Sequence, residues 1–343
     1  MDPEAMLGDA ELSANVGLRR RSSSISDDYS VQKTNDDATE CKFAAVKLNY
    51  YADEFLRHFM HITSEQVIRR DPEISMGYWA RVYALQEIVV KFLQIVGSSS
   101  QIISLGAGFD TLYWRLKRDG RKFKKFVEVD FSSVTAKKIR NIRKPSASEL
   151  VAAFSDKLVE SSHTDLHAGD YHLIGADLRQ SREFREKLES TGIDFNLPTL
   201  CLAECVLVYM SSEQSGRLIS DLAFWLSTAM FVNYEQVAIS DSFGDVMRKN
   251  LERRGLLLPG LSMCVDIETQ SKRFLSSGWG FAQAWTMDEI YSRMLSEKEV
   301  QRIQKIELLD EKELLHQLLA HYCIAIAVKD DSGKYGSLKS ITP

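Results

Sequence analysis

Glycines and carboxylates at the ends of apolar runs are the residues whose types and spacing could bind a nucleoside. Gly106 and Gly108 follow the apolar run Ile102–Leu105, and the next residues have a helical pattern. In such a strand–turn–helix unit the glycines let the backbone approach a ligand, and the helix start offers unpaired N–H groups. Asp130 ends a second apolar run about twenty residues later, where a carboxylate suits ribose hydroxyls. The spacing predicts a nucleoside cofactor, although a tight turn in an α/β core would leave the same pattern.

The glycine turn by itself does not identify the cofactor. A dinucleotide-binding turn needs a small third residue so that helix and strand can pack closely, and Thr111 stands there. The sequence also has no G-x-x-x-x-G-K-[ST] segment for a nucleoside triphosphate. S-adenosylmethionine fits better because it has no pyrophosphate to be held, and Thr111 disfavours an NAD-dependent oxidoreductase.

Further polar residues are expected at the same edge of the sheet, because ligands of open parallel sheets bind beyond the carboxyl ends of the strands. Asp177 follows the third strand and could accept a hydrogen bond from an adenine amino group. Glu204 ends the fourth strand between apolar residues and is costly to bury without a cation. Lys42 and Arg81, on two expected N-terminal helices, could hold a methionine carboxylate, the arginine through a bidentate fork.

The elements that must position these residues alternate between strand and helix. Residues 1–38 are polar, without apolar periodicity, and are expected to be disordered. Residues 39–97 are expected to form a helical lid, and residues 101–343 an α/β core with insertions, in which the serine-rich stretch 145–168 is a mobile loop. The expected strands are Ile102–Leu105, Phe126–Val129, His172–Ile174, Thr199–Ala203, Ala229–Val232 and Cys323–Val328. The expected helices of the core are Asp110–Lys117, Ser132–Arg143, Arg182–Thr191, Glu213–Ser227, Phe243–Arg254, Thr269–Ser276, Met287–Met294 and Glu311–Leu319.

Composition limits the class of protein. The 343 residues are 44% hydrophobic and carry a formal net charge of −5, which gives no overall signature of nucleic-acid binding. Five cysteines occur without a C-x-x-C pair, which favours a reducing compartment, and no histidine belongs to a recognisable metal motif. Without an evident signal peptide or a long apolar span, we expect a cytoplasmic protein, with nuclear presence also open, that binds neither membranes nor a metal and is a monomer.

Taken together and in order, these segments resemble the leucine carboxyl methyltransferase family from about Thr39 to the C-terminus. The resemblance implies a Rossmann-like, class I S-adenosylmethionine-dependent methyltransferase with a mostly parallel, seven-stranded sheet and helices on both faces. The stretches that carry it are Cys41-Lys42, Gly77–Arg81, Ser104–Thr111, Glu128–Phe131, Ile174–Arg179, Ala203–Met210, Val232–Val237 and Asp310–Cys323.

The resemblance also implies an activity. The enzyme would methylate the C-terminal leucine α-carboxylate of the protein phosphatase 2A catalytic subunit, forming a methyl ester and S-adenosylhomocysteine and regulating holoenzyme assembly. The family pattern implies that Tyr209 is an active-site residue near the acceptor carboxylate and that Arg81 is also a catalytic residue. The cofactor residues carried over by position are Lys42, Arg81, Gly106, Asp130, Asp177, Leu178 and Glu204.

Two other functions remain open at this point. A small-molecule carboxyl or O-methyltransferase could use the same cofactor core, because a fold does not determine the substrate. A non-catalytic phosphatase-binding protein could retain the nucleoside fold as a relic, although the intact set of Gly106, Asp130, Asp177 and Glu204 counts against it.

Overall fold

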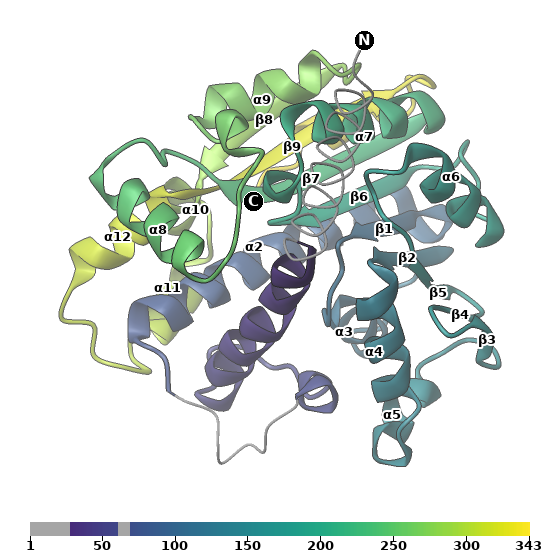
Figure 1. The fold of residues 1–343 in the computed structure, drawn as a ribbon, viewed down its shortest axis with the longest axis horizontal. Helices are drawn as coiled ribbons and strands as arrows, with labels where there is room; N and C mark the ends of the chain where they lie inside the picture. The colour runs from purple at the N-terminus through teal and green to yellow at the C-terminus, as the bar shows by residue number, and fades with distance from the viewer. Residues whose placement is uncertain (1–27, 61–68) are drawn as a thin grey trace, which may run out of the picture.

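A nine-stranded mixed sheet forms the centre of the computed structural model, which describes residues 28–60 and 69–343 (Figure 1). Its strand order is β3-β4-β5-β2-β1-β6-β7-β9-β8. The strands are β1 (Gln101–Leu105), β2 (Lys125–Asp130), β3 (Val159–Ser162), β4 (Asp165–Ala168), β5 (Tyr171–Gly175), β6 (Thr199–Glu204), β7 (Thr228–Gln236), β8 (Phe281–Thr286) and β9 (Tyr322–Asp330).

The five central strands, β5-β2-β1-β6-β7, are parallel, so their carboxyl ends meet at one edge of the sheet. After β1 the chain builds outward through β2 and β5, then returns to place β6 on the other side of β1. The strand order therefore reverses between β1 and β6. Crevices at such a reversal are where open α/β sheets bind ligands.

The expected α/β class is confirmed, but the sheet has nine strands and not the expected seven, because both edges carry antiparallel strands. On one side, β4 pairs antiparallel with β3 and β5, and on the other, β9 pairs antiparallel with β7 and β8. The stretch 145–168, expected to be a mobile loop, holds α5 (Ser148–Ala152) and the β3–β4 hairpin. Strand β3 is polar and exposed, whereas β4 is mostly buried and pairs with β5, so this short hairpin depends on the neighbouring strand and not on an apolar pattern of its own.

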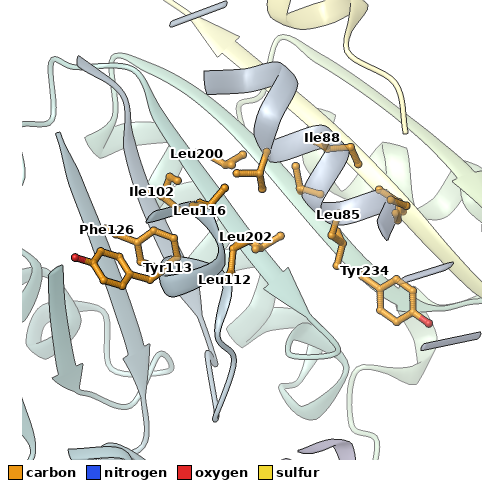
Figure 2. Close-up of a cluster of buried hydrophobic side chains, with 14 of the residues drawn as sticks. Leu85, Ile88, Ile102, Leu112, Tyr113, Leu116, Phe126, Leu200, Leu202 and Tyr234 are labelled. Carbon is orange, nitrogen blue, oxygen red and sulfur yellow. The ribbon is translucent and has the colours of Figure 1, made fainter. Parts of the chain in front are cut away.

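Helices cover both faces of the sheet because buried strand residues alternate between two apolar clusters. Ile102 packs with the layer that contains α2 and α3, whereas its neighbour Ile103 packs with the layer that contains α7 and α9. Figure 2 shows Leu85 of α2 and Leu112 of α3 in the same cluster as Ile102. The helices are α2 (Pro72–Val96), α3 (Leu112–Arg118), α4 (Ser132–Ile142), α6 (Ser181–Ser190), α7 (Ser212–Trp225), α8 (Ser242–Arg253), α9 (Ile267–Leu275), α10 (Met287–Arg293), α11 (Glu297–Ile303) and α12 (Lys312–Ala320).

A further helix covers residues 28–47 and is purple in Figure 1. The expectation of a disordered tail to residue 38 is therefore wrong for residues 28–38; its first 27 residues lie outside the described part of the chain. Long-range polar contacts hold this part of the helix: Asp28 accepts two hydrogen bonds of 2.8 Å from Arg179, and Gln32 accepts one from Ser133. Apolar periodicity could not reveal it, because partners distant in sequence stabilise the helix.

A buried ion pair between α4 and β2 contacts the segment that follows the glycine turn. Lys138 of α4 and Glu128 of β2 are almost fully buried, with 2.6 Å between Nζ and Oε2. Tyr171 donates a hydrogen bond of 2.6 Å to the same carboxylate, and Lys138 Nζ donates one of 2.8 Å to the carbonyl of Asp110. Since buried charges persist only with partners, this pair ties α4 to the segment that follows the glycine turn.

Within residues 28–60 and 69–343, no helix combines the length and apolar character that crossing a bilayer requires. The same residues contain no group of three or more His, Cys, Asp or Glu side chains arranged to hold a metal ion. All five cysteines are unpaired thiols.

Candidate active site

A cavity of about 310 Å³ lies at the carboxyl edge of the parallel strands, where the helix of residues 28–47 and α2 cover it. Loop residues from the ends of β1, β2, β5 and β6 form its floor. All of the residues singled out from the sequence line this one cavity: Lys42, Arg81, Gly106, Asp130, Asp177, Leu178, Glu204 and Tyr209.

The glycine turn has the backbone that only glycine adopts without strain. Gly106 and Gly108 have φ of +57° and +50°. A Cβ on Gly106 would stand 2.6 Å from Cγ2 of Val206, and a Cβ on Gly108 would overlap the side-chain oxygen of Asn35. That oxygen accepts a hydrogen bond of 2.7 Å from the backbone N–H of Phe109. The helix of residues 28–47 is thus joined directly to the turn.

Two cations converge on Glu204. Arg81 Nε donates a hydrogen bond of 2.8 Å to Oε2 of Glu204, and Lys42 Nζ lies 3.7 Å from the same oxygen. Burial by itself lowers the pKa of Arg81, but Glu204 outweighs it and holds the pKa well above its usual range. Lys42 also lies 3.4 Å from Oδ2 of Asp110. The cavity therefore holds fixed positive and negative charges side by side.

Asp130 lies at the end of β2 with both carboxylate oxygens engaged by the backbone. It accepts hydrogen bonds of 2.7 Å from Gly108 N–H and Phe131 N–H. Burial raises the pKa of Asp130 to about 6, despite these N–H donors and the nearby charge of Lys138, which favour the ionised form. The carboxylate is consequently ionised at neutral pH and begins to take up a proton in mildly acidic solution.

Asp177 and Leu178 follow β5, where the chain leaves the sheet. Asp177 accepts hydrogen bonds from Arg179, including one of 2.8 Å between Nη2 and Oδ2. The guanidinium of Arg179 also holds Asp28. Arg179 therefore connects the cavity-lining carboxylate of Asp177 to the start of the described N-terminal helix.

The turn after β6 carries the candidate active-site tyrosine. Cys205 has φ of +55°, a left-handed conformation that costs a non-glycine residue about 1–3 kcal/mol. The backbone N–H of Cys205 donates a hydrogen bond of 2.7 Å to the carbonyl oxygen of Tyr234, which holds this conformation in place. Burial raises the pKa of the Cys205 thiol to about 12. Burial also raises the pKa of the Tyr209 phenol, which therefore stays protonated at neutral pH and remains a hydrogen-bond donor.

The two polar residues at the end of β7 have different surroundings. Gln236 lines the cavity, but Glu235 is fully buried, and burial raises the pKa of its carboxyl to about 7 against the attraction of Arg273. Glu235 points away from the cavity because alternate residues of a strand face opposite sides of the sheet.

The cavity residues that the sequence reasoning did not single out include Asn35, Arg179 and Arg254. Asn35 lies in the segment expected to be disordered, and Arg179 immediately follows the recognised Asp177-Leu178 pair. Arg254 follows α8 and forms an ion pair with Asp37. The position of Arg179 beside Asp177 was the one available signal, because the other two reach the cavity through contacts between distant segments.

Comparison with known proteins places the chain among methyltransferases. A family model described as leucine carboxyl methyltransferase matches residues 28–223. The chain is 50% identical over 331 residues to leucine carboxyl methyltransferase 1 of Caenorhabditis elegans, covering 95% of this chain and 99% of that one. For the Bos taurus protein of the same name the identity is 42% over 318 residues, covering 92% and 94%.

A more distant relative is the tRNA wybutosine-synthesizing protein 4 of Homo sapiens, 37% identical over 309 residues, which are 88% of this chain and 44% of that protein. Among solved structures, a candidate methyltransferase from Thermobifida fusca aligns with a TM-score of 0.50 at 12% identity, covering 85% of this chain and 94% of that one. This likeness supports the fold alone.

We predict that Gly106→Ala destabilises the protein by about 1–3 kcal/mol, because the new Cβ meets Val206 and the residue must keep a left-handed backbone. The measurement is the denaturant midpoint in urea. Gly216→Ala is the control, because Gly216 lies inside α7 and a Cβ there would meet no other atom within 4 Å; it should be neutral or stabilising by up to about 1 kcal/mol. Equal midpoints for Gly106→Ala and wild type would contradict the strain argument.

Proposed function

Because this chain belongs to the leucine carboxyl methyltransferase family and is an S-adenosylmethionine-dependent methyltransferase, we propose that it methylates the C-terminal leucine carboxylate of the protein phosphatase 2A catalytic subunit. The products are a methyl ester and S-adenosylhomocysteine. The observation that supports this most is the single cavity in which the charges needed for the cofactor and a protonated tyrosine lie together.

The charge arrangement of the cavity suits a bound zwitterion. The methionine part of the cofactor carries an α-carboxylate and an α-ammonium group. We assign the carboxylate to Arg81 and Lys42 and the ammonium group to Glu204, whose carboxylate pairs with both cations. Cofactor binding then replaces one set of buried ion pairs with another, so no buried charge is left alone.

The nucleoside part suits the ends of β2 and β5. We assign the ribose hydroxyls to Asp130, the adenine amino group to Asp177, and the adenine face to Leu178, with Gly106 allowing the ligand to approach the backbone. Asp177 accepts a hydrogen bond from Arg179. Adenine binding must share or displace that arginine.

The acceptor needs positioning more than activation. A C-terminal carboxyl has a pKa of about 3.5, so it is an anion at neutral pH and requires no general base. S-adenosylmethionine supplies an activated methyl group on a sulfonium. Holding acceptor and methyl in line can contribute about 7–11 kcal/mol to lowering the barrier. We assign to the protonated Tyr209 a hydrogen bond to the carboxylate oxygen that does not attack, which orients the other oxygen.

The proposed substrate is tested by incubating the purified enzyme and cofactor with the phosphatase catalytic subunit, followed by mass spectrometry of the C-terminal peptide. We expect a gain of one methyl on the terminal leucine and no gain on a subunit that lacks this residue. A methyl found elsewhere, or transfer only to small carboxylic acids, would reject the proposal.

Cofactor affinity should depend on pH through Asp130. Its pKa of about 6 means that the carboxylate is ionised above pH 7 and is progressively protonated as the pH falls through 6. Ribose hydroxyls donate to the ionised form, so affinity should be highest above pH 7 and decline by up to about tenfold per pH unit below 6. Calorimetric titration with S-adenosylhomocysteine between pH 5 and 8 measures this decline. Asp130→Asn should bind more weakly at pH 7.5 and lose most of the decline; an identical slope in both proteins would contradict the assignment.

Tyr209→Phe should lower turnover about 10- to 100-fold while leaving cofactor affinity within about twofold, because the lost hydroxyl orients the acceptor and not the cofactor. Initial-rate kinetics and calorimetry separate the two effects. Arg81→Lys provides the contrast: a point charge cannot replace the guanidinium fork, so cofactor affinity itself should fall. Wild-type turnover in Tyr209→Phe would remove the tyrosine from the mechanism.

A further inference from the structure

Among the described residues, four cationic side chains line the cavity, and they differ in how firmly they are held. Lys42 and Arg81 are each 12% exposed and share Glu204. Arg179 is joined to the carboxylates of two separate segments. Arg254 is 53% exposed and pairs with Asp37, itself 41% exposed. Ion pairs between such exposed groups contribute only about 0–1 kcal/mol, so the partner of Arg254 is readily exchanged.

Arg254 begins a segment that lies between the helix of residues 28–47 and the turn that carries Tyr209. A Cβ on the next residue, Gly255, would lie 3.3 Å from Oγ of Ser30 in the N-terminal helix. A Cβ on Gly260 would lie 2.7 Å from the carbonyl oxygen of Met210, directly after Tyr209. The segment that begins at Arg254 therefore packs against both the helix of residues 28–47 and the turn that carries the hydroxyl of Tyr209.

Apolar side chains accompany this arginine in the cavity wall. Leu251 and Leu256 flank Arg254 in sequence and line the same cavity, and Leu256 is almost fully buried. A cation beside branched apolar side chains complements a C-terminal leucine, which presents a carboxylate and an isobutyl group on one carbon. Neither feature is needed by the cofactor, whose charged groups are already matched by Arg81, Lys42 and Glu204.

On the basis of the function proposed above, we propose that Arg254 releases Asp37 and binds the acceptor carboxylate in its place. The incoming carboxylate takes the guanidinium, and Leu251 and Leu256 receive the leucine side chain. Methyl transfer forms a bond between a carboxylate oxygen and the methyl carbon, and the carbon–sulfur bond breaks with its electron pair left on sulfur. The ester is neutral, so it no longer competes with Asp37 for Arg254.

The half-exposed setting of Arg254 suits capture better than catalysis. The carboxylate loses its charge during the reaction, so a cation held tightly against it would stabilise the substrate more than the transition state. A solvated arginine with a nearby replacement anion attracts the substrate at modest cost to the chemical step. Arg254 therefore acts as a positioning residue for binding, and its loss should appear in KM.

The test is steady-state kinetics of Arg254→Ala with the phosphatase catalytic subunit as substrate. We expect KM for the protein substrate to rise about 10- to 100-fold, as for the loss of a charge-assisted hydrogen bond, with kcat within about twofold and cofactor affinity unchanged. Arg253→Ala is the matched control, because Arg253 precedes Arg254, is exposed and contacts Asn250 outside the cavity wall. It should keep the wild-type KM although it removes the same charge.

Asp37→Asn separates substrate capture from a purely structural ion pair. If Arg254 captures the carboxylate, removing its competitor leaves KM unchanged or lower. A rise in KM that is equal in Asp37→Asn and Arg254→Ala would overturn the proposal, because the pair would then only hold the lid. So would a fall in kcat at constant KM. Absence of methylation by the wild-type enzyme would instead reject the proposed substrate, which keeps the two failures distinct.

Discussion

The buried pair of Arg81 and Glu204 is the interaction on which the rest of the site depends. It joins α2 to the carboxyl end of β6, and the guanidinium also lies 4.5 Å from the ring centroid of Tyr234 and 5.8 Å from that of Tyr78. A buried arginine without a carboxylate would be costly, as would the carboxylate alone. The pair therefore fixes the position of α2 relative to the sheet.

The group of paired charges also includes Asp110, which follows the glycine turn. Burial alone would raise the pKa of this carboxyl, but Lys42, Arg115 and Lys138 together hold it well below its usual range. Lys42 lies between Asp110 and Glu204, so a single cation couples the helix that follows the turn to the charge pair on β6. Because the charges are mutually neutralised, a zwitterionic ligand can enter without leaving one of them alone.

Sequence reasoning succeeded where a local pattern controls the structure. The five parallel strands are near-continuous apolar runs, such as Thr199–Glu204, and their order along the chain predicts that residues at their ends meet. The helix of residues 28–47 and the hairpin of β3 and β4 are not encoded this way. Asp28 needs Arg179, and β4 needs β5, so neither element is visible in a short window.

The site residues divide along the same line. Gly106 and Asp130 were predictable because a turn or a strand end determines their place, and cation partners for Glu204 followed from the cost of burying a lone carboxylate. Asn35 and Arg254 were not predictable, since each reaches the cavity from a segment whose packing depends on contacts with distant residues.

Cys205 lines the cavity to which we assign S-adenosylmethionine, whose sulfonium methyl group is an alkylating agent. A thiolate there would be a better nucleophile than any carboxylate and would consume the methyl group itself. Burial raises the pKa of this thiol to about 12, so almost none of it is ionised at neutral pH, although Arg81 nearby favours the anion. The burial that strengthens the ion pairs of the cavity thus also keeps this thiol protonated, and a protonated thiol is a poor nucleophile toward the methyl group.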